Sequence, residues 1–174
     1  MIFAVVGPSG AGKDTLIDGV IAARPDLRRM RRVITRPSAS GGEDFEGVSD
    51  PEFQRRLTAG DFALYWQAHG LHYAIPRSQL EMPGDAIFNG SRAALGQALG
   101  RVRDLVVVLV TAPDEVLAHR LAARGREAEH DIRARLSRAA FCLPAGITPR
   151  VVVNDGTAEV GIARLLAALQ PVSA

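Results

Sequence analysis

The residues with the clearest chemical meaning form a glycine-rich turn directly after an apolar segment at residues 2–6: Gly7, Pro8, Ser9, Gly10, Ala11, Gly12 and Lys13. Glycines allow the backbone to direct successive N–H groups toward one point, and the start of a following helix adds positive potential there. A lysine at the end of such a turn brings a compact cation to the β- and γ-phosphates of a nucleotide. This spacing is that of a P-loop, and it predicts that the turn binds a nucleotide's terminal phosphates.

Lys13 is the single lysine among the 21 basic residues of the chain, because every other basic residue is arginine. A composition rich in arginine, alanine and glycine is typical of a GC-rich coding sequence. Where such a chain keeps a lysine, a compact ammonium group is favoured over the planar fork of a guanidinium. The composition therefore supports the phosphate-binding role of Lys13.

Position 14 departs from the usual pattern, which has serine or threonine after the lysine. Asp14 offers a carboxylate, which is a good ligand for Mg²⁺, and Thr15 follows one residue later. An acidic residue in the first turn of a helix also favours the helix dipole, so Asp14 has a purely structural alternative. The apolar segments at 105–110 and 86–88 are followed by Thr111 and Asn89 rather than by an acid, which favours a metal role for Asp14. Whether Asp14 or Thr15 would ligate the ion stays open.

The overall composition is that of one globular domain, with 174 residues, 47% hydrophobic residues and a net charge of +2. Such balanced charge excludes a protein that coats nucleic acid, and we expect the arginine-rich run at 28–32 to be a solvated strand edge. The longest apolar run, at 105–110, is far shorter than the roughly 20 residues that span a bilayer. A single cysteine, Cys142, fits a reducing compartment, and residues 1–6 lack the basic start of a signal peptide. We expect a cytoplasmic protein that binds neither nucleic acid nor membrane.

Hydrophobic patterning predicts strands that alternate with helices. Strands are expected at 2–6, 30–35, 85–89, 105–110 and 151–153, with a hairpin over 62–73 that breaks at His69-Gly70. Helices are expected at 13–23, 51–57, 91–99, 112–123, 131–140 and 157–169. This alternation predicts a parallel sheet with helices on both sides and a ligand at the carboxyl ends of the strands.

Several stretches together resemble the guanylate-kinase family from end to end. Beside the P-loop, Thr35-Arg36-Pro37 with residues 42–49 is similar to that family's acceptor-phosphate segment. Residues 121–136 resemble its lid, and residues 153–155 resemble the strand end that borders the adenine. The resemblance implies an α/β fold of the P-loop NTPase type, with three α/β/α layers, a parallel five-stranded core sheet, a small substrate-binding β subdomain and a helical lid. It implies one domain over 1–174, with the core at about 1–34, 85–122 and 141–174, the insert at about 35–80 and the lid at about 123–140.

The departures from that family concern the acceptor. Leu64 stands where the family reads guanine with a glutamate, Ile75 replaces a threonine, and Phe45 replaces a phosphate-binding tyrosine. A second arginine is also missing from residues 38–40. A site that loses its hydrogen bonds to a base discriminates against that base by roughly 10⁴-fold or more, so guanylate is not the expected acceptor.

A closer resemblance is to the ribose 1,5-bisphosphate phosphokinases of phosphonate catabolism, which are relatives of the guanylate kinases. It rests on the P-loop that ends in Asp14 and on the stretches 33–37, 66–70 and 89–92. The resemblance implies transfer of the γ-phosphoryl group of ATP, with Mg²⁺, to ribose 1,5-bisphosphate. This transfer forms 5-phospho-α-D-ribosyl 1-diphosphate, so the resemblance implies a role in the biosynthesis of that compound.

On this hypothesis Lys13 and the lid residues Arg124 and Arg135 are catalytic, because they would neutralise charge on the transferring group. The nucleotide would contact the P-loop residues together with Asp14, Thr15 and Asn154, and Asp14 would bind the metal. The acceptor would contact residues of the insert and of the following strand: Thr35, Arg36, Gln67, His69, Tyr73, Arg77, Asn89, Ser91 and Arg92. Among these, Arg36 would bind an acceptor phosphate, and Arg77 and Arg92 are candidates for the second phosphate.

Several alternatives stay open from the sequence. Arg124 and Arg135 could pair with neighbouring acids on a solvated helix, and His69 could be an ordinary hairpin residue. The chain could instead be a nucleoside monophosphate kinase with altered base preference, or a non-catalytic guanylate-kinase-like domain that binds partner proteins. A monomer and a homodimer are both compatible with the sequence.

Overall fold

The computed structural model describes residues 1–38, 43–123 and 143–171. Its main sheet has five parallel strands in the order β2-β7-β1-β8-β9. These strands are β1 (Ile2–Val6), β2 (Arg28–Arg29), β7 (Ala86–Asn89), β8 (Leu105–Thr111) and β9 (Arg150–Val153). The central strand β1 is covered on both faces, which explains why its sequence is apolar throughout.

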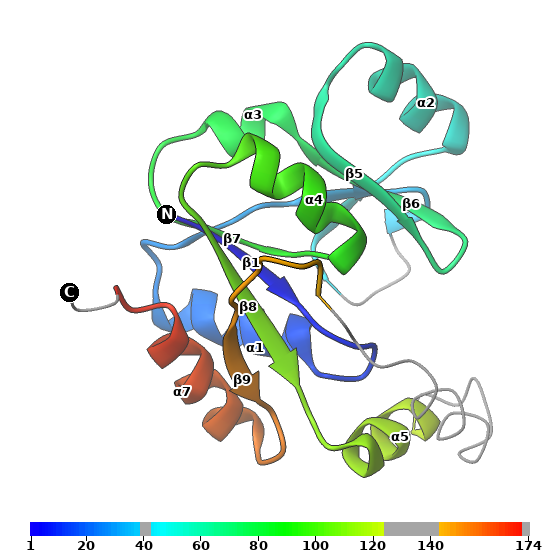
Figure 1. Cartoon of the computed structure of the whole chain (residues 1–174). Helices are drawn as coiled ribbons and strands as arrows, with labels where there is room; N and C mark the ends of the chain where they lie inside the picture. The colour runs from blue at the N-terminus through cyan, green and yellow to red at the C-terminus, as the bar shows by residue number, and fades with distance from the viewer. Residues whose placement is uncertain (39–42, 124–142, 172–174) are drawn as a thin grey trace.

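Helices cover both faces of this sheet, as Figure 1 shows. The helices α1 (Lys13–Ala23) and α7 (Ala158–Ala168) pack together on one face, where Leu16, Val20 and Leu165 join Phe3 in a buried core. On the other face lies α4 (Arg92–Arg101), whose apolar side chains form a second core with alternate residues of β1 and β8. The helix α5 (Asp114–Ala122) follows β8. The expected three-layer α/β/α fold with a five-stranded parallel sheet is therefore confirmed.

A second, smaller sheet of four strands has the order β4-β3-β6-β5. It consists of β3 (Arg32–Ile34), β4 (Phe45–Gly47), β5 (Phe62–Ala68) and β6 (Leu71–Pro76). The hairpin β5–β6 turns at His69 and Gly70, which both have positive φ, 51° and 73°, as a two-residue turn of type I′ requires. Leu64, Trp66 and Ile75 enter the same core as α4, so the second sheet is packed firmly against the main one.

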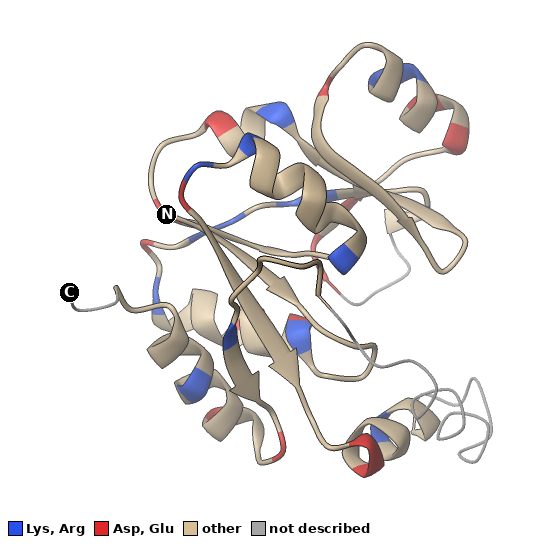
Figure 2. Ribbon diagram, viewed as in Figure 1, with Lys and Arg blue, Asp and Glu red and all other residues tan. Residues whose placement is uncertain are grey.

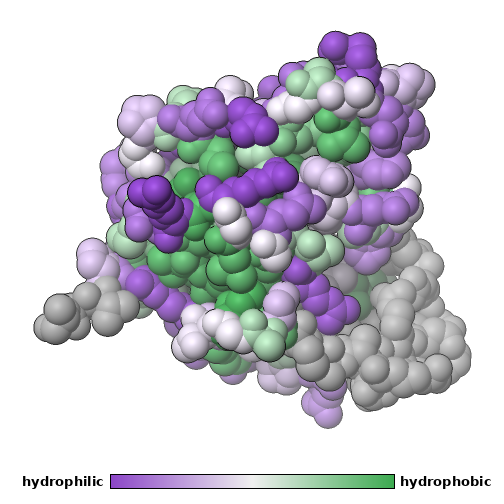
Figure 3. All heavy atoms as spheres, turned by 45° about the horizontal axis from the view of Figure 1, so that its top comes forward, coloured by the Kyte–Doolittle hydropathy of each residue, from purple (hydrophilic) through white to green (hydrophobic). Residues whose placement is uncertain are grey.

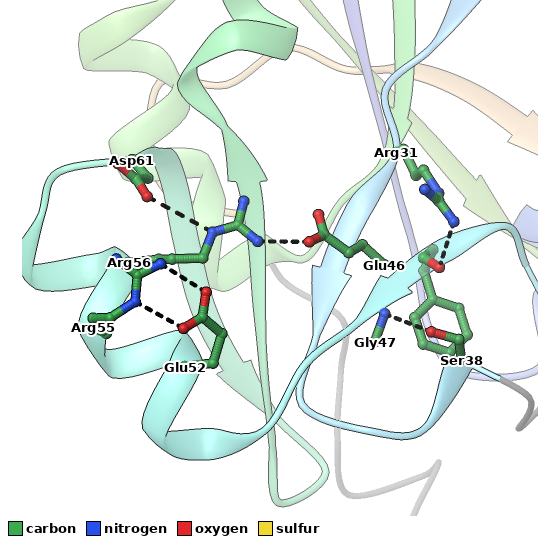
Figure 4. Close-up of polar contacts among 9 residues, drawn as sticks. Arg31, Ser38, Glu46, Gly47, Glu52, Arg55, Arg56 and Asp61 are labelled. Atoms are coloured by element: carbon green, nitrogen blue, oxygen red, sulfur yellow. Dashed lines mark hydrogen bonds and ion pairs between the residues drawn. The ribbon is translucent and has the colours of Figure 1, made fainter.

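Two short helices, α2 (Asp50–Thr58) and α3 (Arg77–Glu81), lie in the same part of the chain as the second sheet. The helix α2 begins at the N-cap Ser49, and α3 follows β6. Arg56 on α2 pairs with Glu46 on β4 at 2.8 Å and lies 3.8 Å from Asp61, as Figure 4 shows. These contacts hold α2 against the outer strand of the second sheet.

Most of the expected elements are present, and the differences have local causes. The expected strand at 30–35 contains only β3 of the second sheet, whereas β2, at residues 28–29 just before it, belongs to the main sheet and was not expected. The helix expected at 112–123 is α5, which begins only at Asp114, because Pro113 disfavours helical backbone at the residue before it, Ala112. The helix expected at 91–99 is α4, which continues through Gly100 to Arg101. The strand β4 and the helix α3 were not expected, and the helix expected at 131–140 lies outside the described residues.

The arginine-rich run at 28–32 lies along the segment that passes from the main sheet to the second sheet, as Figure 2 shows. The expected solvated edge is wrong for Arg32, whose side chain is buried. Apolar surface remains visible between hydrophilic residues on the face that Figure 3 shows. Within 1–38, 43–123 and 143–171, none of the helices has the length and apolarity needed to cross a membrane.

Candidate active site

The P-loop joins β1 to α1 at the carboxyl edge of the main sheet. Gly7, Gly10 and Gly12 have φ angles of 155°, 87° and 85°, which L side chains rarely adopt. A Cβ on Gly7 would also lie 2.0 Å from the carbonyl oxygen of Val110, so the loop approaches the neighbouring strand β8 more closely than another residue would permit. The glycines of the motif are therefore required by the backbone path.

Lys13 is the first residue of α1, and its side chain folds back over the loop. Its Nζ donates to the carbonyl oxygens of Gly7 at 2.9 Å and of Pro8 at 3.0 Å. These contacts hold the ammonium group at the mouth of the loop, beside the N-terminus of the helix, where anions are favoured. The geometry matches the phosphate site that the motif predicts.

Asn154 supports the loop from beneath. Its side chain is 5% exposed, and its Nδ2 donates to the carbonyl oxygen of Ala11 at 2.8 Å. A Cβ on Gly12 would lie 2.6 Å from this Nδ2, and a Cβ on Gly161 would lie 2.5 Å from its Oδ1. The amide thus fills a slot between the loop and α7, and the nucleotide contact that the resemblance implies for Asn154 stays a prediction.

Asp155 follows Asn154 and fixes the end of β9. Its carboxylate accepts a hydrogen bond of 2.6 Å from Arg164 on α7. The Arg164 hydrogen bond is the largest of the effects that lower the pKa of Asp155 below its ordinary value. The pair therefore joins β9 to α7 beside the slot that holds Asn154.

Asp14, the candidate metal ligand, is the second residue of α1. Its Oδ1 accepts a hydrogen bond of 2.5 Å from Nδ2 of Asn89, the last residue of β7. The described ranges contain no cluster of three or more His, Cys, Asp or Glu side chains that could hold a metal ion alone. A single carboxylate beside a phosphate loop fits Mg²⁺, which is usually bound by one or two carboxylates together with substrate phosphates.

A cavity of about 220 Å³ lies between the P-loop and the second sheet. Its lining brings together residues from the loop, from α1 and from the two strand ends: Gly7, Ser9, Gly10, Gly12, Lys13, Asp14, Thr15, Asn89, Gly90 and Ser91. The wall toward the second sheet consists of Arg32, Trp66, Ala68, His69 and Tyr73. Of the predicted acceptor residues, the structure places His69, Tyr73, Asn89 and Ser91 at this cavity.

Arg32 is a site residue that the sequence analysis missed. Its side chain is 8% exposed and forms a bidentate ion pair with Glu43, while Nη1 donates to the carbonyl oxygen of Asn89 at 3.1 Å. Its guanidinium also lies 5.2 Å from the ring centroid of Tyr73, which stacks on Trp66 at 5.6 Å. Its position two residues before Ile34, on the same face of β3, could have indicated this placement.

Thr35 and Arg36 line a separate cavity of about 580 Å³ together with residues 47–51. The Thr35 hydroxyl accepts a hydrogen bond of 2.9 Å from the backbone N–H of His72. The Arg36 guanidinium lies 4.3 Å from the ring centroid of Phe45. The structure thus places the predicted acceptor segment next to the β3–β4 pair and outside the lining of the P-loop cavity.

Other predicted residues do not line the P-loop cavity. Gln67 is exposed and lies on the opposite face of β5 from Trp66 and Ala68. Arg77 donates to the carbonyl oxygen of Gly60 at 3.3 Å, and Arg92 is exposed at the first residue of α4. Arg124 and Arg135, the predicted lid residues, lie outside the described residues.

A third cavity, of about 400 Å³, lies on the other side of the P-loop, between α5 and the end of β9. Its lining includes Gly10, Thr15, Arg120 and Asn154. Arg120 donates to the backbone carbonyl oxygen of Asn154 at 2.9 Å, which places a second cation beside the loop. Arg120 was not predicted, because the resemblance indicates lid arginines only beyond residue 123 in this region.

Solved structures with a similar architecture show which fold the chain has. A guanylate kinase from Anaplasma phagocytophilum matches with a TM-score of 0.65 and 20% identity, over 97% of this chain and 85% of that one. A gluconokinase from Sinorhizobium meliloti matches with a TM-score of 0.52 and 15% identity, over 96% and 90%. Together with the strand–P-loop–helix unit, this likeness shows a guanylate-kinase-like fold built around a P-loop.

Curated relatives specify the family further. "Ribose 1,5-bisphosphate phosphokinase PhnN" of Ruegeria sp. (strain TM1040) is 47% identical over 173 residues, which cover 97% of this chain and 91% of the relative. The protein of the same name from Agrobacterium fabrum is 45% identical, over 91% and 90%. The chain belongs to the ribose 1,5-bisphosphate phosphokinase family.

A longer relative has a second activity in its name. "Bifunctional ribose 1,5-bisphosphokinase-thymidine phosphorylase" of Cupriavidus necator is 48% identical over 172 residues, but the chain spans 29% of its length. No family model matches the chain.

Proposed function

We propose that this chain transfers the γ-phosphoryl group of ATP to the 1-phosphate of ribose 1,5-bisphosphate, with Mg²⁺, and forms 5-phospho-α-D-ribosyl 1-diphosphate. The acceptor is the one that the names of the relatives from Ruegeria and Agrobacterium specify. The second activity of the bifunctional relatives is not part of the proposal, because the chain spans only 29% of the Cupriavidus necator protein.

The observation that carries the proposal is the wall of the P-loop cavity opposite the loop. Leu64 and Ile75, which replace the base-reading residues of the guanylate kinases, are fully buried in the core and offer no hydrogen bond to a base. Arg32, Tyr73 and Trp66 occupy the wall instead. The cavity of about 220 Å³ is smaller than the roughly 300–1,000 Å³ typical of sites for drug-sized ligands, which favours a small acceptor.

The chemistry requires positioning and charge neutralisation more than covalent steps. An acceptor phosphate is largely a dianion at neutral pH, so it is a nucleophile without a general base. Lys13 and the backbone N–H groups of the loop would hold the β- and γ-phosphates. Mg²⁺ would neutralise charge on these phosphates, and Asp14 is the residue that would hold it. His69 and Ser91, on opposite sides of the cavity, are candidates for contacts to the sugar.

The charge that develops during transfer needs further cations. Arg124 and Arg135 remain our candidates for contacts to the transferring group. Arg36 remains our candidate for an acceptor phosphate, and its neighbouring cavity of about 580 Å³ has room for one. Arg120 beside the P-loop is a further cation on the nucleotide side.

Two other functions receive less support. A nucleoside monophosphate kinase would need polar groups at the positions that Leu64 and Ile75 occupy in the core. A non-catalytic binding domain would not need Lys13 or the strained glycines of the loop.

The test is ³¹P NMR of the purified protein with ATP, Mg²⁺ and ribose 1,5-bisphosphate. We expect loss of the γ-phosphorus signal of ATP and new signals from a diphosphate on the sugar, at a rate that falls about 10³-fold for Lys13→Ala. Guanylate and adenylate replace the sugar in parallel samples. Turnover of a nucleoside monophosphate in preference to the sugar would refute the proposed acceptor, and failure to bind ATP would refute the kinase.

A further inference from the structure

Asn89 ends β7, Asp14 lies in the first turn of α1 after the neighbouring parallel strand β1, and the two side chains meet at the carboxyl edge of the main sheet. In the register of β1 and β7, Asn89 lies opposite Val5, and the P-loop begins two residues after Val5. The amide nitrogen of Asn89 reaches across to Oδ1 of Asp14 at 2.5 Å, although the residues are 75 positions apart. The contact therefore depends on the sheet order and not on local sequence.

In ordinary P-loop NTPases, Mg²⁺ is held by a serine or threonine of the loop together with an aspartate of another element, the Walker B acid. The chain has the two types of side chain in the opposite order. The acid, Asp14, is at the loop position, and the neutral hydrogen-bonding residue, Asn89, is at a strand end. Each arrangement supplies one negative charge and one hydrogen bond between the two residues.

We propose that Asn89 is a positioning residue that orients the Asp14 carboxylate for a divalent cation. In this pair the acid lies at the loop position and the neutral hydrogen-bonding residue at the strand end, whereas the usual pair has a loop hydroxyl and a strand-end acid. The inference rests on the proposed function, because the cation is the one that would accompany the nucleotide. With Oδ1 fixed by the amide, Oδ2 of Asp14 is the oxygen assigned to the cation.

The orientation of the Asn89 amide follows from its partner. An ionised carboxylate only accepts hydrogen bonds, so the nitrogen and not the oxygen of the amide must face Asp14. An aspartate at position 89 would place two carboxylates in contact, and one of them would be forced to take up a proton. An acid at position 14 therefore requires a neutral donor at position 89.

Further contacts hold Asn89 in place. Its side chain is 9% exposed, and its backbone carbonyl accepts a hydrogen bond of 3.1 Å from Arg32. Arg32 is in turn held by both oxygens of Glu43. Residues that hold a metal-binding side chain in this way tune its affinity, and their loss typically weakens metal binding by 10–100-fold.

The first experiment measures Mn²⁺ binding by the loss of its free-ion EPR signal in the presence of ADP, with ADP alone as the baseline. We expect Asn89→Ala to weaken Mn²⁺ binding by the protein–ADP complex about 10-fold or more. The affinity for ADP in EDTA should change less than threefold. Gln170→Ala, which removes an exposed amide at the end of α7, serves as the matched control and should bind Mn²⁺ as the wild type does. Unchanged Mn²⁺ affinity in Asn89→Ala overturns the inference.

The second experiment exchanges the two side chains, and thermal unfolding checks that each variant folds. Asp14→Ser and Asn89→Asp should each bind Mn²⁺ weakly, whereas the double variant should bind more tightly than either, because the usual hydroxyl and acid are then present. If the fold-loss of Mn²⁺ affinity in the double variant equals the product of the fold-losses in the two single variants, the inference is overturned, since Asn89 would then act independently of Asp14. Neither readout uses ribose 1,5-bisphosphate, so a wrong acceptor would refute the proposed function and leave these results unaffected.

Discussion

The side-chain amide of Asn154 donates a hydrogen bond of 2.8 Å to the backbone carbonyl oxygen of Ala11, although the residues are 143 positions apart. The amide lies between Gly12 of the loop and Gly161 of α7, and a side chain at either glycine would collide with it. The shape of the phosphate-binding loop thus depends on a residue near the C-terminal end of the described chain.

Replacing this amide should loosen the loop. We expect Asn154→Ala to lower the free energy of unfolding by about 1–3 kcal/mol, because the buried Ala11 carbonyl loses its partner. The affinity for ADP should fall as well, since the loop's N–H groups are held less firmly. Urea unfolding and ADP titration measure the two effects, with Gln170→Ala, which removes an exposed amide just beyond α7, for comparison. Full stability together with wild-type ADP affinity would show that the slot does not support the loop.

Lys13 should be needed for transfer and not for folding. We expect Lys13→Ala to reduce kcat about 10³-fold, because the ammonium group near the β- and γ-phosphates is lost. Lys13→Arg keeps the charge but replaces the compact ammonium with a planar fork, so it should recover only part of the rate. Thermal unfolding of both variants serves as the folding control. A rate near that of the wild type in Lys13→Ala would place Lys13 away from the transferring group.

Asp14 should set the Mg²⁺ requirement. We expect Asp14→Ala to raise the Mg²⁺ concentration that gives half-maximal activity, because the ion would keep only its phosphate ligands. A Mg²⁺ titration at saturating ATP measures the effect, with Asp18→Ala on the exposed side of α1 as a control. If the two variants have the wild-type titration, Asp14 only favours the start of the helix.

The ion pair between Arg32 and Glu43 is buried, with side-chain exposures of 9% and 10%. Arg32→Met should destabilise the protein by about 3–5 kcal/mol, because Glu43 is left buried without its partner. The double variant Arg32→Met/Glu43→Leu should be more stable than the single variant. Urea unfolding measures both, and a single variant as stable as the double would mean that Glu43 moves into water.

The contact between Asp155 and Arg164 should depend on pH. The Arg164 hydrogen bond lowers the pKa of Asp155, so its contribution to stability is present above the unfolded pKa and is lost as the pH falls through the lowered folded value. NMR titration of the carboxyl carbon should give a pKa below the ordinary value, and Arg164→Gln should return it toward normal. Because both side chains are substantially exposed, salt should weaken the effect. An unshifted pKa in the wild type would contradict the pairing.

The main sheet was predictable because its signals are local. An apolar strand, the glycines of the loop and the amphipathic helix α1 each follow from short-range patterning, and the bounds of α1 agree with the prediction. The second sheet was harder, since β3 is three residues long and the arginine-rich run at 28–32 that leads into it suggests a solvated surface. Alternation along β3 could place Arg32 on the face of Ile34, but no short-range pattern shows that Glu43 pairs with it.

The candidate site divides in the same way. The P-loop could be read from its spacing, whereas the hydrogen bond from Asn89 to Asp14 depends on which strands are neighbours in the sheet. Side chains alternate between the two faces of β5, and this pattern alone predicts that Gln67 lies on the opposite face from Trp66 and Ala68, away from the cavity.

The acceptor is the central claim, and a competition assay tests it most directly. The protein receives γ-³²P-labelled ATP in limiting amount, with Mg²⁺ and equal concentrations of ribose 1,5-bisphosphate and guanylate. Because Leu64 and Ile75 are buried in the core and offer no hydrogen bond to a base, the label should appear in 5-phospho-α-D-ribosyl 1-diphosphate. Label in guanosine diphosphate would contradict the account.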